Sequence, residues 1–458
     1  MLLKGGRVVY EKGIKELDIR IKEEKIASLA KDLAPAEGEE VINVAGKLIF
    51  PGIIDSHTHF NLYSRGTVTV DDFYRGGISA AFGGVTTVID YADQESGSLI
   101  KGLEVRKAEA RDAVIDYSFH LVLNNNFQPE GQSVELDLLR EAGVSSLKIF
   151  TTYKGLYLLD DDKLAPLFKA AREAGLLITV HAEKDEIISQ REETYRSRDK
   201  LGVRYHPEIR PGIAEGEAIK HLVGLVEEHD CPLYIVHLSS REGYQEVLQA
   251  REKGLDLYVE TTPHYLLLTR KLLEGADGRL NLMTPPLRGA EDNEALWEGV
   301  SAGIIDVIAT DHCAFSIEQK AQGSNSLDIL PGIPGVETLL PLLYTYGVEE
   351  RRISLPRMVE LLCSNPARLF GLYPEKGSLE VGTDADLVVY DPGVEWELRG
   401  DNLHSGSGYT PYQGMRVKGK SIMTILRGKV IVEGDRFTGR KGDGRFIKAW
   451  QSSAFSRS

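Results

Sequence analysis

Six side chains of types that bind metal ions each follow or end a short apolar run: His57, His59, Lys148, His181, His237 and Asp311. His57 and His59 form a His-Thr-His motif, and side-chain alternation along a strand places both imidazoles on one face. Such a pair can bind one metal ion, but taken alone it fits two surface histidines equally well. Six such residues at the ends of five apolar runs are hard to obtain by accident. The pattern therefore predicts a metal centre.

Lys148 requires a separate argument, because a lysine at a strand end could simply pair with a carboxylate. Beside divalent cations an ammonium would be repelled, and its pKa would fall. A neutral lysine amine can add CO₂ to form a carbamate (N6-carboxylysine), whose two oxygens can bridge two metal ions. Four histidines, one aspartate and this carbamate would then hold two divalent ions about 3.5–4 Å apart, with a hydroxide between them.

The remaining histidines do not follow this pattern. Four of them fall in helical or loop sequence typical of the surface: His206, His221, His229 and His404. His120 lies within an apolar run and His264 just beyond one, so both fit a supporting contact near the site. His312 follows Asp311 directly, and it fits either a contact to a ligand or substrate or a loop contact.

Eight apolar runs alternate with amphipathic stretches through the middle of the chain. The runs, expected as strands, are 47–54, 85–91, 117–123, 145–150, 176–180, 233–236, 255–259 and 304–309. Helical patterns between them include 161–174, 213–228 and 241–253. Strand–helix units repeated eight times predict an α/β fold, a (β/α)₈ TIM-type barrel over residues 51–372 with a long crossover loop near 262–290. Strand C-termini surround the active site of such a barrel, so the six side chains would converge there.

The two ends of the chain have a different sequence pattern, in which apolar and polar residues alternate and turn residues separate the alternating stretches. Residues 1–50 and 373–458 each show this pattern. Neither end has enough strands to be stable alone, so we expect them to pair into one small β-sandwich domain. The tail from Arg436 on is mildly basic and Gly-rich, and we expect it to pack on another subunit or to fray.

Composition excludes several classes of protein. The 458 residues are 42% hydrophobic and 27% charged, which is ordinary for a globular chain. Asp and Glu outnumber Lys and Arg by 69 to 54, so the net charge of −15 argues against a nucleic-acid-binding surface. The three cysteines are widely spaced, which fits a reducing cytoplasm. No apolar run approaches the ~20 residues that span a bilayer. We expect a cytoplasmic protein with no nucleic-acid or membrane partner.

Longer motifs allow a comparison with known families. They include FPGIIDSHTHF at 50–60, GGVTTVID at 83–90, SLKIF at 146–150, HAE at 181–183, VHLS at 236–239, PPLR at 285–288, TDHC at 310–313 and GTDADL at 382–387. With these motifs the chain resembles the amidohydrolase superfamily, in particular its dihydropyrimidinase/D-hydantoinase group of cyclic amidases. The matching sequence covers nearly the whole chain.

The resemblance implies roles for individual residues. One zinc ion would be held by His57, His59 and Asp311, the other by His181 and His237, and carbamylated Lys148 would touch both. Tyr153 would donate to the substrate carbonyl, Asp311 would also act as the catalytic acid–base, and main-chain groups near Thr284 and Pro331 would meet the ring amides. The group also suggests a homo-oligomer, a tetramer or a dimer.

Two departures from the group bear on substrate binding. Thr284 stands where the group usually has Ser, which matters little if main-chain atoms make the contact. The chain reads Leu330-Pro331-Gly332 where the group usually reads Pro-Asn-Gly. Proline has no N–H, so any amide donor at Pro331 is lost.

Related activities leave alternatives open. Dihydroorotases have an arginine where this chain has Asn61, although residues 332–338 look somewhat like theirs. Allantoinases have Asn at that position, but followed by Glu-Pro-Gly rather than Leu62-Tyr63-Ser64. Some dihydropyrimidinase-like proteins are non-catalytic assembly proteins that have lost metal ligands, whereas this chain keeps all six. We therefore expect an enzyme that opens 5,6-dihydropyrimidines or 5-substituted hydantoins to N-carbamoyl amino acids.

Overall fold

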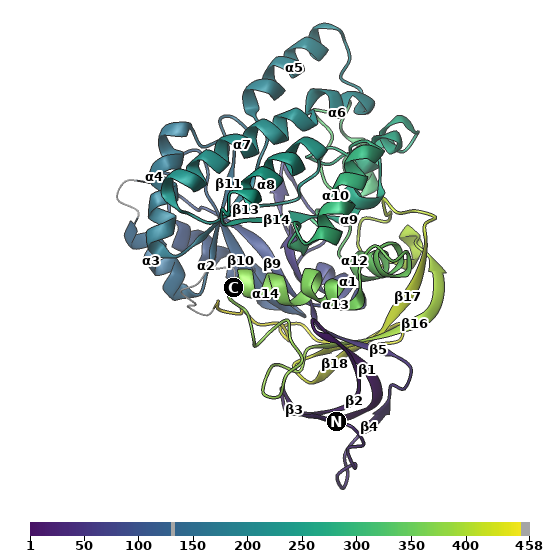
Figure 1. The fold of residues 1–458 in the computed structure, drawn as a ribbon. Helices are drawn as coiled ribbons and strands as arrows, with labels where there is room; N and C mark the ends of the chain where they lie inside the picture. Colours follow the sequence, from purple (N-terminus) through teal and green to yellow (C-terminus); the bar gives the residue numbers. More distant parts are fainter. Residues whose placement is uncertain (130–132, 450–458) are drawn as a thin grey trace.

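Eight parallel strands ringed by helices form the larger part of the molecule (Figure 1) in the computed structural model, which describes residues 1–129 and 133–449. Each strand pairs with the next in chain order, and a parallel bridge between Thr58 and His312 joins the last strand to the first. The strands are β6 Ile53–Thr58, β9 Val85–Asp93, β10 Asp116–Val122, β11 Ser146–Phe150, β12 Leu177–His181, β13 Leu233–Ile235, β14 Leu257–Thr261 and β15 Val307–Ile308. The predicted (β/α)₈ barrel is confirmed.

Helices follow the strands and cover the outside of the barrel. Their bounds are α1 Arg75–Phe82, α2 Leu99–Glu109, α3 Ser133–Ala142, α4 Asp161–Ala174, α5 Asp185–Ser197, α6 His206–Ile209, α7 Gly212–His229, α8 Arg241–Glu252, α9 Pro263–Leu267, α10 Ala290–Ala302, α11 Ile317–Ala321, α12 Leu339–Leu343, α13 Leu355–Val359 and α14 Asn365–Leu369. Helix α4 has the predicted bounds. Two acidic residues in its first turn favour its N-terminus, and Gly175 ends it in the left-handed region with φ of 67°.

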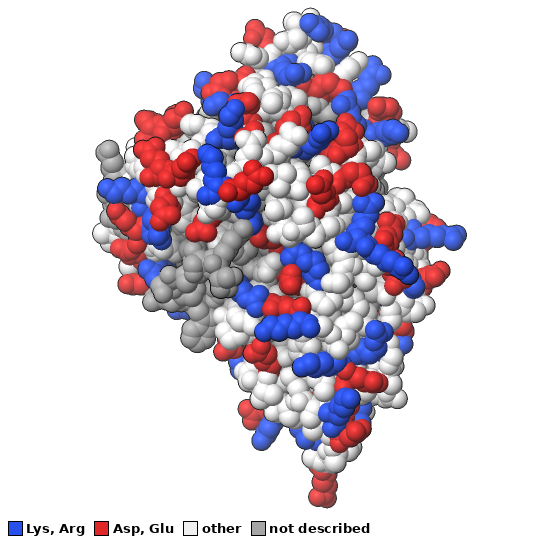
Figure 2. Space-filling model, viewed as in Figure 1, with Lys and Arg blue, Asp and Glu red and all other residues white. Residues whose placement is uncertain are grey.

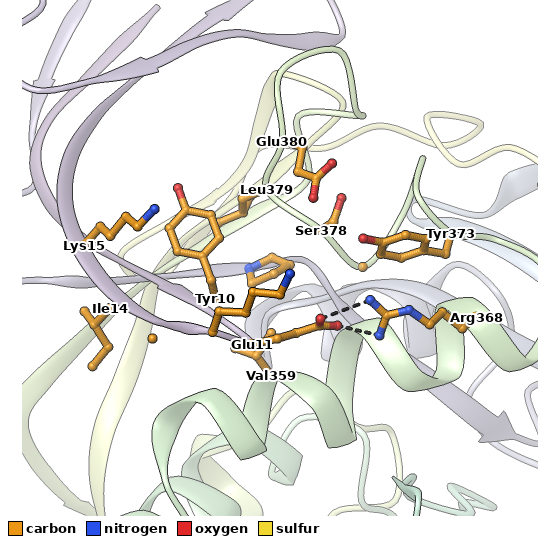
Figure 3. Close-up of a pocket in the computed structure, with 14 residues that line it drawn as sticks. Tyr10, Glu11, Ile14, Lys15, Val359, Arg368, Tyr373, Ser378, Leu379 and Glu380 are labelled. Atoms are coloured by element: carbon orange, nitrogen blue, oxygen red, sulfur yellow. Dashed lines mark hydrogen bonds and ion pairs between the residues drawn. The ribbon is translucent and has the colours of Figure 1, made fainter. Parts of the chain in front are cut away.

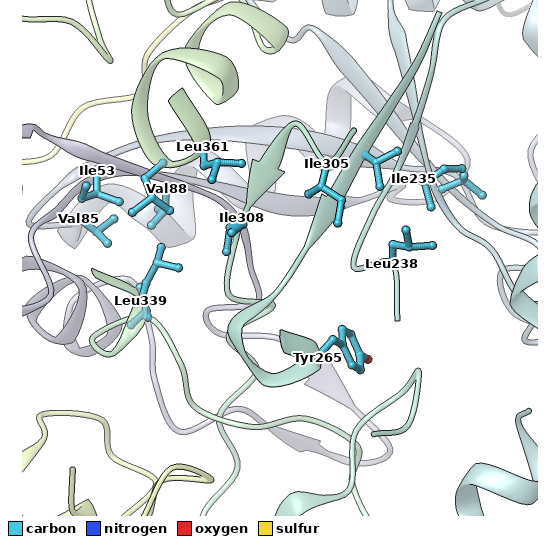
Figure 4. Close-up of a cluster of buried hydrophobic side chains, with 14 of the residues drawn as sticks. Ile53, Val85, Val88, Ile235, Leu238, Tyr265, Ile305, Ile308, Leu339 and Leu361 are labelled. Carbon is cyan, nitrogen blue, oxygen red and sulfur yellow. The ribbon is translucent and has the colours of Figure 1, made fainter. Parts of the chain in front are cut away.

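Alternation along the barrel strands supplies two apolar layers. Ile53 and Val88 point outward into the layer between strands and helices (Figure 4). Their neighbours Ile54 and Ile89 point inward, where they pack with Tyr234 and Phe370. This inner cluster fills the barrel interior below the C-terminal ends of the strands.

Strands from both chain ends form a second sheet, which lies below the barrel in Figure 1. Antiparallel pairing of β16 with β5 joins the two ends, and Leu387 faces Pro51 in that register. The strands are β1 Leu2–Tyr10, β2 Gly13–Lys22, β3 Lys25–Ala30, β4 Val41–Asn43, β5 Leu48–Pro51, β16 Leu387–Glu397, β17 Arg416–Leu426, β18 Lys429–Glu433 and β19 Arg436–Phe437. The predicted pairing of the ends is confirmed, while the domain bounds at 50 and 373 stay a prediction.

Charged side chains join this sheet to the barrel. Glu11 and Arg368 form a two-bonded ion pair of 2.6 and 3.0 Å across a cavity of about 450 Å³ at the junction (Figure 3). Deeper in the junction, the buried Lys376 ammonium lies 2.5 Å from Asp116 of the barrel and 2.6 Å from Asp386 of the sheet. Because these partners come from both parts, burial of the ions fixes how the parts sit together.

The first barrel strand differs from the prediction. Residues 47–54 were expected to form one strand, but the chain changes sheets at Gly52, between β5 and β6. A Cβ at Gly52 would lie 2.1 Å from the Thr86 hydroxyl oxygen, so only glycine fits this close approach. The apolar run reads continuously because both strands are buried on both faces.

Two other segments differ from the description expected of them. The region 262–290 is not one long loop, since it contains α9 and two 3₁₀ turns, η3 Arg270–Glu274 and η4 Gly278–Asn281. The tail, expected to fray or to pack on another subunit, packs on its own barrel as far as residue 449, and residues 450–458 lie outside the described part of the chain. The Tyr117 amide donates to the Arg445 carbonyl at 2.9 Å, and the Phe446 ring stacks 5.9 Å from that of Phe119. Aromatic side chains at the start of β10 supply the apolar surface that holds it.

Acidic and basic side chains are mixed over the face shown in Figure 2. Among the described residues, no helix combines the length and the apolar character that crossing a membrane requires.

Candidate metal centre

A cavity of about 410 Å³ opens where the barrel strands end. All six predicted metal-binding side chains line it, as do Tyr153, Thr284 and Pro331. The six come from the ends of β6, β11 and β12 and from the turns that follow β6, β13 and β15. Residues up to 254 positions apart in sequence (311 − 57) therefore meet at one opening, as the barrel topology predicts.

His57, His59 and Asp311 form the first group. The Nε2 atoms of both imidazoles lie 3.1 Å from Oδ1 of Asp311. Burial alone would raise the pKa of Asp311, but the two imidazoles hold it well below its usual range. Ligand atoms of His57, His237 and Asp311 all lie within 4.8 Å of one another, which is compact enough for one ion to reach all three.

His181 and His237 form the second group, with Nδ1 of the first 3.1 Å from Nε2 of the second. The other nitrogen of His181, Nε2, lies 2.6 Å from the Glu183 carboxylate, which can only accept, so Nε2 carries the proton. Nδ1 of His181 therefore presents a lone pair toward His237. Both rings are buried, and burial lowers the pKa of each. A cation between two such nitrogens would satisfy both.

Carboxylates behind the histidines were missed by the sequence analysis. Glu260, at the end of β14, accepts from Nδ1 of His57 at 2.7 Å and from the His237 amide at 3.1 Å. Glu183 is fixed in turn by Arg210, whose Nη2 lies 2.5 Å away. Each carboxylate orients an imidazole and selects which nitrogen faces the cavity, as is usual behind metal-binding histidines. The available signal was position, since both residues lie within two positions of a strand end.

Lys148 is buried beside these groups, with its Nζ 5.2 Å from the centre of the Tyr91 ring and 5.0 Å from that of Phe150. Among the residues described, no carboxylate lies within ion-pair distance of Nζ. Burial lowers the pKa of Lys148 to about 7, although Glu260 and Asp311 oppose this shift. A substantial fraction of the amine is therefore neutral near pH 7, the form that a carbamate requires.

Three residues at this site have a strained backbone. Tyr153, His237 and Asp311 adopt positive φ of 66°, 41° and 50°, a conformation that costs most residues about 1–2 kcal/mol. The Asp311 turn is held by buried Asp55, which accepts from the Thr310 amide at 3.0 Å and from the Thr310 hydroxyl at 2.5 Å. Strain that surrounding bonds sustain is typical of active sites, where it aims side chains that a relaxed backbone would turn away.

This donor set fits divalent metal ions. Three buried imidazoles, the partly exposed His59 and one carboxylate supply nitrogen and oxygen ligands. Two of the buried rings have their proton directed outward to a carboxylate, and the cavity leaves space between the ligands.

Comparison with known proteins agrees with the geometry. A sequence model of the amidohydrolase family matches residues 48–431. The chain belongs to the amidohydrolase family. It is 36% identical to a D-hydantoinase from Ralstonia pickettii and 39% identical to a D-phenylhydantoinase from Escherichia coli O1:K1, each match covering 98% of both chains. The crystal structure of a dihydropyrimidinase from Brevibacillus agri superposes with a TM-score of 0.96 at 35% identity, over 100% of this chain and 99% of that one. Amidohydrolases are metal-dependent.

Tyr153 lies beside the metal-type residues of this amidohydrolase. Its ring centre is 5.5 Å from that of His181, and the Arg210 guanidinium lies 5.3 Å over the ring. Burial raises the pKa of the Tyr153 phenol. The hydroxyl therefore keeps its proton at neutral pH, and it lies within hydrogen-bonding reach of the Thr284 side chain.

Thr284 and Pro331, the other two residues predicted to bind the substrate, lie on two segments of the cavity wall that are joined by a backbone hydrogen bond. The Gly332 amide, next to Pro331, donates to the Leu282 carbonyl at 3.0 Å, so it is already used. Pro331 has no N–H, so its carbonyl oxygen is the main-chain group that it can offer to a ligand. Its neighbour Cys313 has Sγ 3.9 Å from that oxygen.

His206 was predicted at the surface and is instead buried beside Thr284 in the amidohydrolase wall. Its Nε2 lies 3.1 Å from the Met283 carbonyl and 3.3 Å from the Thr284 hydroxyl. Burial lowers the pKa of His206 to about 3, so the ring is neutral. The prediction was wrong because the segment before α7 folds inward over the barrel mouth.

The three other histidines that were expected near the site have different surroundings. His312 makes a loop contact: Nδ1 accepts from the Gly335 and Val336 amides at 3.1 and 3.2 Å, and Nε2 lies 3.0 Å from Asp71. His120 lies 2.6 Å from the Ser146 hydroxyl and 3.0 Å from the Ser56 carbonyl, next to the cavity wall. Buried His264 has a ring with neither nitrogen bonded to any described residue.

Proposed function

We propose that this cavity hydrolyses the ring amide of 5-substituted hydantoins and 5,6-dihydropyrimidines, giving N-carbamoyl amino acids. The chain is a cyclic amidohydrolase, in line with the D-hydantoinase, D-phenylhydantoinase and dihydropyrimidinase to which it is similar. The observation that carries the proposal is the convergence of six metal-binding side chains and Tyr153 on one opening.

The centre would hold two divalent metal ions, most readily zinc, because imidazole and oxygen ligands suit it. His57, His59 and Asp311 would bind one ion and His181 and His237 the other, with Lys148 bridging them as a carbamate formed with CO₂. Two such ions would supply a hydroxide nucleophile at neutral pH and polarise the ring carbonyl.

The chain's own groups would do the rest of the chemistry. The Asp311 carboxylate would take a proton from the nucleophile and return it to the leaving ring nitrogen, acting first as base and then as acid. The Tyr153 hydroxyl would donate a hydrogen bond to the carbonyl oxygen as negative charge develops there. The Pro331 carbonyl would accept from a ring N–H, and the Thr284 main chain would position the opposite edge of the ring.

We also propose that the enzyme is a cytoplasmic homo-oligomer, a tetramer or a dimer, as the group it resembles suggests. Multi-angle light scattering of the purified chain would give its mass relative to the 50.7 kDa monomer. A monomer at micromolar concentration would overturn this part of the proposal.

A substrate panel tests the reaction. Zinc-loaded enzyme would be assayed with hydantoin, phenylhydantoin, dihydrouracil, allantoin and dihydroorotate. We expect the first three to be opened and dihydroorotate to be poor, since Asn61 stands where an arginine would bind the ring carboxylate. If allantoin or dihydroorotate were the best substrate, the assignment within the family would be wrong, and turnover of no ring would favour a non-catalytic protein.

A further inference from the structure

A short hairpin at the cavity mouth has an arginine at a turn position that disfavours this residue type. Strands β7 Tyr63–Ser64 and β8 Thr67–Val68 pair directly, which leaves Arg65 and Gly66 as the two turn residues. Both have positive φ, 46° and 85°. Such turns favour Asn, Asp or Gly at the first position, and a residue like arginine costs about 1–2 kcal/mol there. The reason for Arg65 must therefore lie in its side chain.

Among the described residues, the guanidinium is held in place through one of its nitrogens. Nη1 of Arg65 donates to the Leu327 carbonyl at 2.6 Å and to the Ile329 carbonyl at 3.0 Å. In the part of the chain that the structure describes, no carboxylate lies within ion-pair distance of Arg65. The group is thus oriented by two neutral acceptors while its charge is left without a counter-ion, and its remaining N–H groups stay available.

The free charge acts on the substrate cavity. Arg65 lines the same opening as the metal-type residues, beside the apolar side chains of Leu62, Tyr63 and Leu156. Its positive charge reaches the Tyr153 phenol, where it opposes the pKa rise that burial causes. A substituent on a ring bound near Tyr153 would therefore run along apolar surface toward a fixed guanidinium at the exposed rim.

We propose that Arg65 selects cyclic amides whose exocyclic substituent ends in a carboxylate, which it binds at the cavity mouth. The proposal rests on the proposed function and adds its substrate class: carboxyalkyl rings, whose products are N-carbamoyl derivatives of acidic amino acids. The planar guanidinium suits a carboxylate because two parallel N–H groups can donate to its two oxygens. A carboxylate attached directly to the ring, as in dihydroorotate, would not extend to the rim.

A matched pair of substrates isolates the charge. The probes are racemic 5-(2-carboxyethyl)hydantoin and its neutral isostere 5-(2-carbamoylethyl)hydantoin, with unsubstituted hydantoin as reference. The zinc-loaded wild type should prefer the carboxylate by about tenfold in kcat/KM, mainly through KM, since hydrogen bonds between charged groups are worth roughly twice neutral ones. Raising the salt concentration should reduce that preference.

Variants separate substrate recognition from a purely structural bond to the 327–329 loop. Arg65→Gln should abolish the tenfold preference, and Arg65→Lys should keep part of it because the charge remains. Arg279→Gln removes another exposed guanidinium that bonds a backbone carbonyl, outside the cavity, and should keep the full preference. Equal use of both probes by the wild type, or an equal loss on both in Arg65→Gln, would overturn the proposal. If the wild type opened none of the three rings, the proposed function would fail first, and this proposal with it.

Discussion

At the scale of single residues, the Tyr153 hydroxyl carries the clearest mechanistic prediction. Removing one donor to a developing oxyanion typically costs ~10²–10³-fold in turnover, about 2.7–4 kcal/mol. Tyr153→Phe should lower kcat by that factor while metal content and melting temperature stay the same, because only one oxygen is lost from the ring that packs near His181. Steady-state kinetics with elemental analysis checks both. Near wild-type kcat would reduce Tyr153 to a packing residue.

Lys148 allows a second test at this scale. Lys148→Ala removes the proposed bridge, so we expect the loss of one or both metal ions and of nearly all activity. A short carboxylic acid added to the variant should restore part of the activity by supplying two oxygens in the space left by the side chain. Intact mass measured gently in the presence of CO₂ should show the carbamate on the wild type. An unmodified amine in active, metal-loaded enzyme would contradict this.

The sequence identified the residues that line the candidate metal site better than those that support it. His57 and Asp311 stand at strand ends, where topology alone brings them together. Glu260 and Arg210 act through hydrogen bonds to other side chains. The position of Glu260 at a strand end was a signal, but no spacing shows which side chain it contacts. His206 shows the same limit, because its burial depends on how a connecting segment folds over the barrel.

At the scale of elements, the C-terminal tail makes a testable contribution to stability. Phe446 packs on Phe119 and Tyr117 at the start of β10. Phe446 is partly buried, so Phe446→Ala should lower the free energy of unfolding by no more than roughly 1.5–3 kcal/mol, the value of fully burying one large apolar side chain. Lys448→Ala changes an exposed neighbour and should shift it by less than about 0.5 kcal/mol. Chemical denaturation measures both, and equal small effects would mean that the tail adds nothing to the fold.

Elements whose apolar residues recur with a clear helical or strand period were predicted well. Boundaries that depend on one close contact with a distant residue were not. Helix α4 shows apolar residues at helical spacing between acidic residues and a glycine, so both its ends were visible. The change of sheet at Gly52 depends on Thr86, which lies 34 positions away (86 − 52) and leaves no local signal. Tail packing likewise depends on aromatic residues more than 300 positions earlier in the chain.

At the scale of the whole molecule, Lys376 links the barrel to the terminal sheet. Lys376→Met leaves buried Asp386 without its ammonium, while Asp116 keeps the Arg427 guanidinium, and the loss should cost about 3–5 kcal/mol at pH 7. Lys25→Met removes a more exposed ammonium that also pairs with carboxylates, and should cost less than about 1 kcal/mol. Unfolding at pH 7 compares the two. Equal losses of unfolding free energy in the two variants would show that burial does not strengthen the contribution of these ion pairs to stability.

The loss of stability caused by Lys376→Met should depend on pH. Burial raises the pKa of Asp386 even though Lys376 opposes it, so removing the lysine raises this pKa further. A carboxyl whose pKa is higher in the folded state stabilises the fold at low pH and loses that contribution as the pH rises through the folded value. The deficit of Lys376→Met should therefore shrink on acidification. Unfolding curves from pH 8 to pH 5 measure it, and a constant deficit would contradict the assignment.

The central claim is that metal held by the six side chains at the barrel mouth opens the ring of a cyclic amide. Titrating the purified enzyme with a chelator, while following both bound metal and hydantoin hydrolysis, tests it most directly. Activity should fall in proportion to the metal removed and return when zinc is restored, up to two ions per chain. Full hydrolysis by metal-free protein would contradict the account.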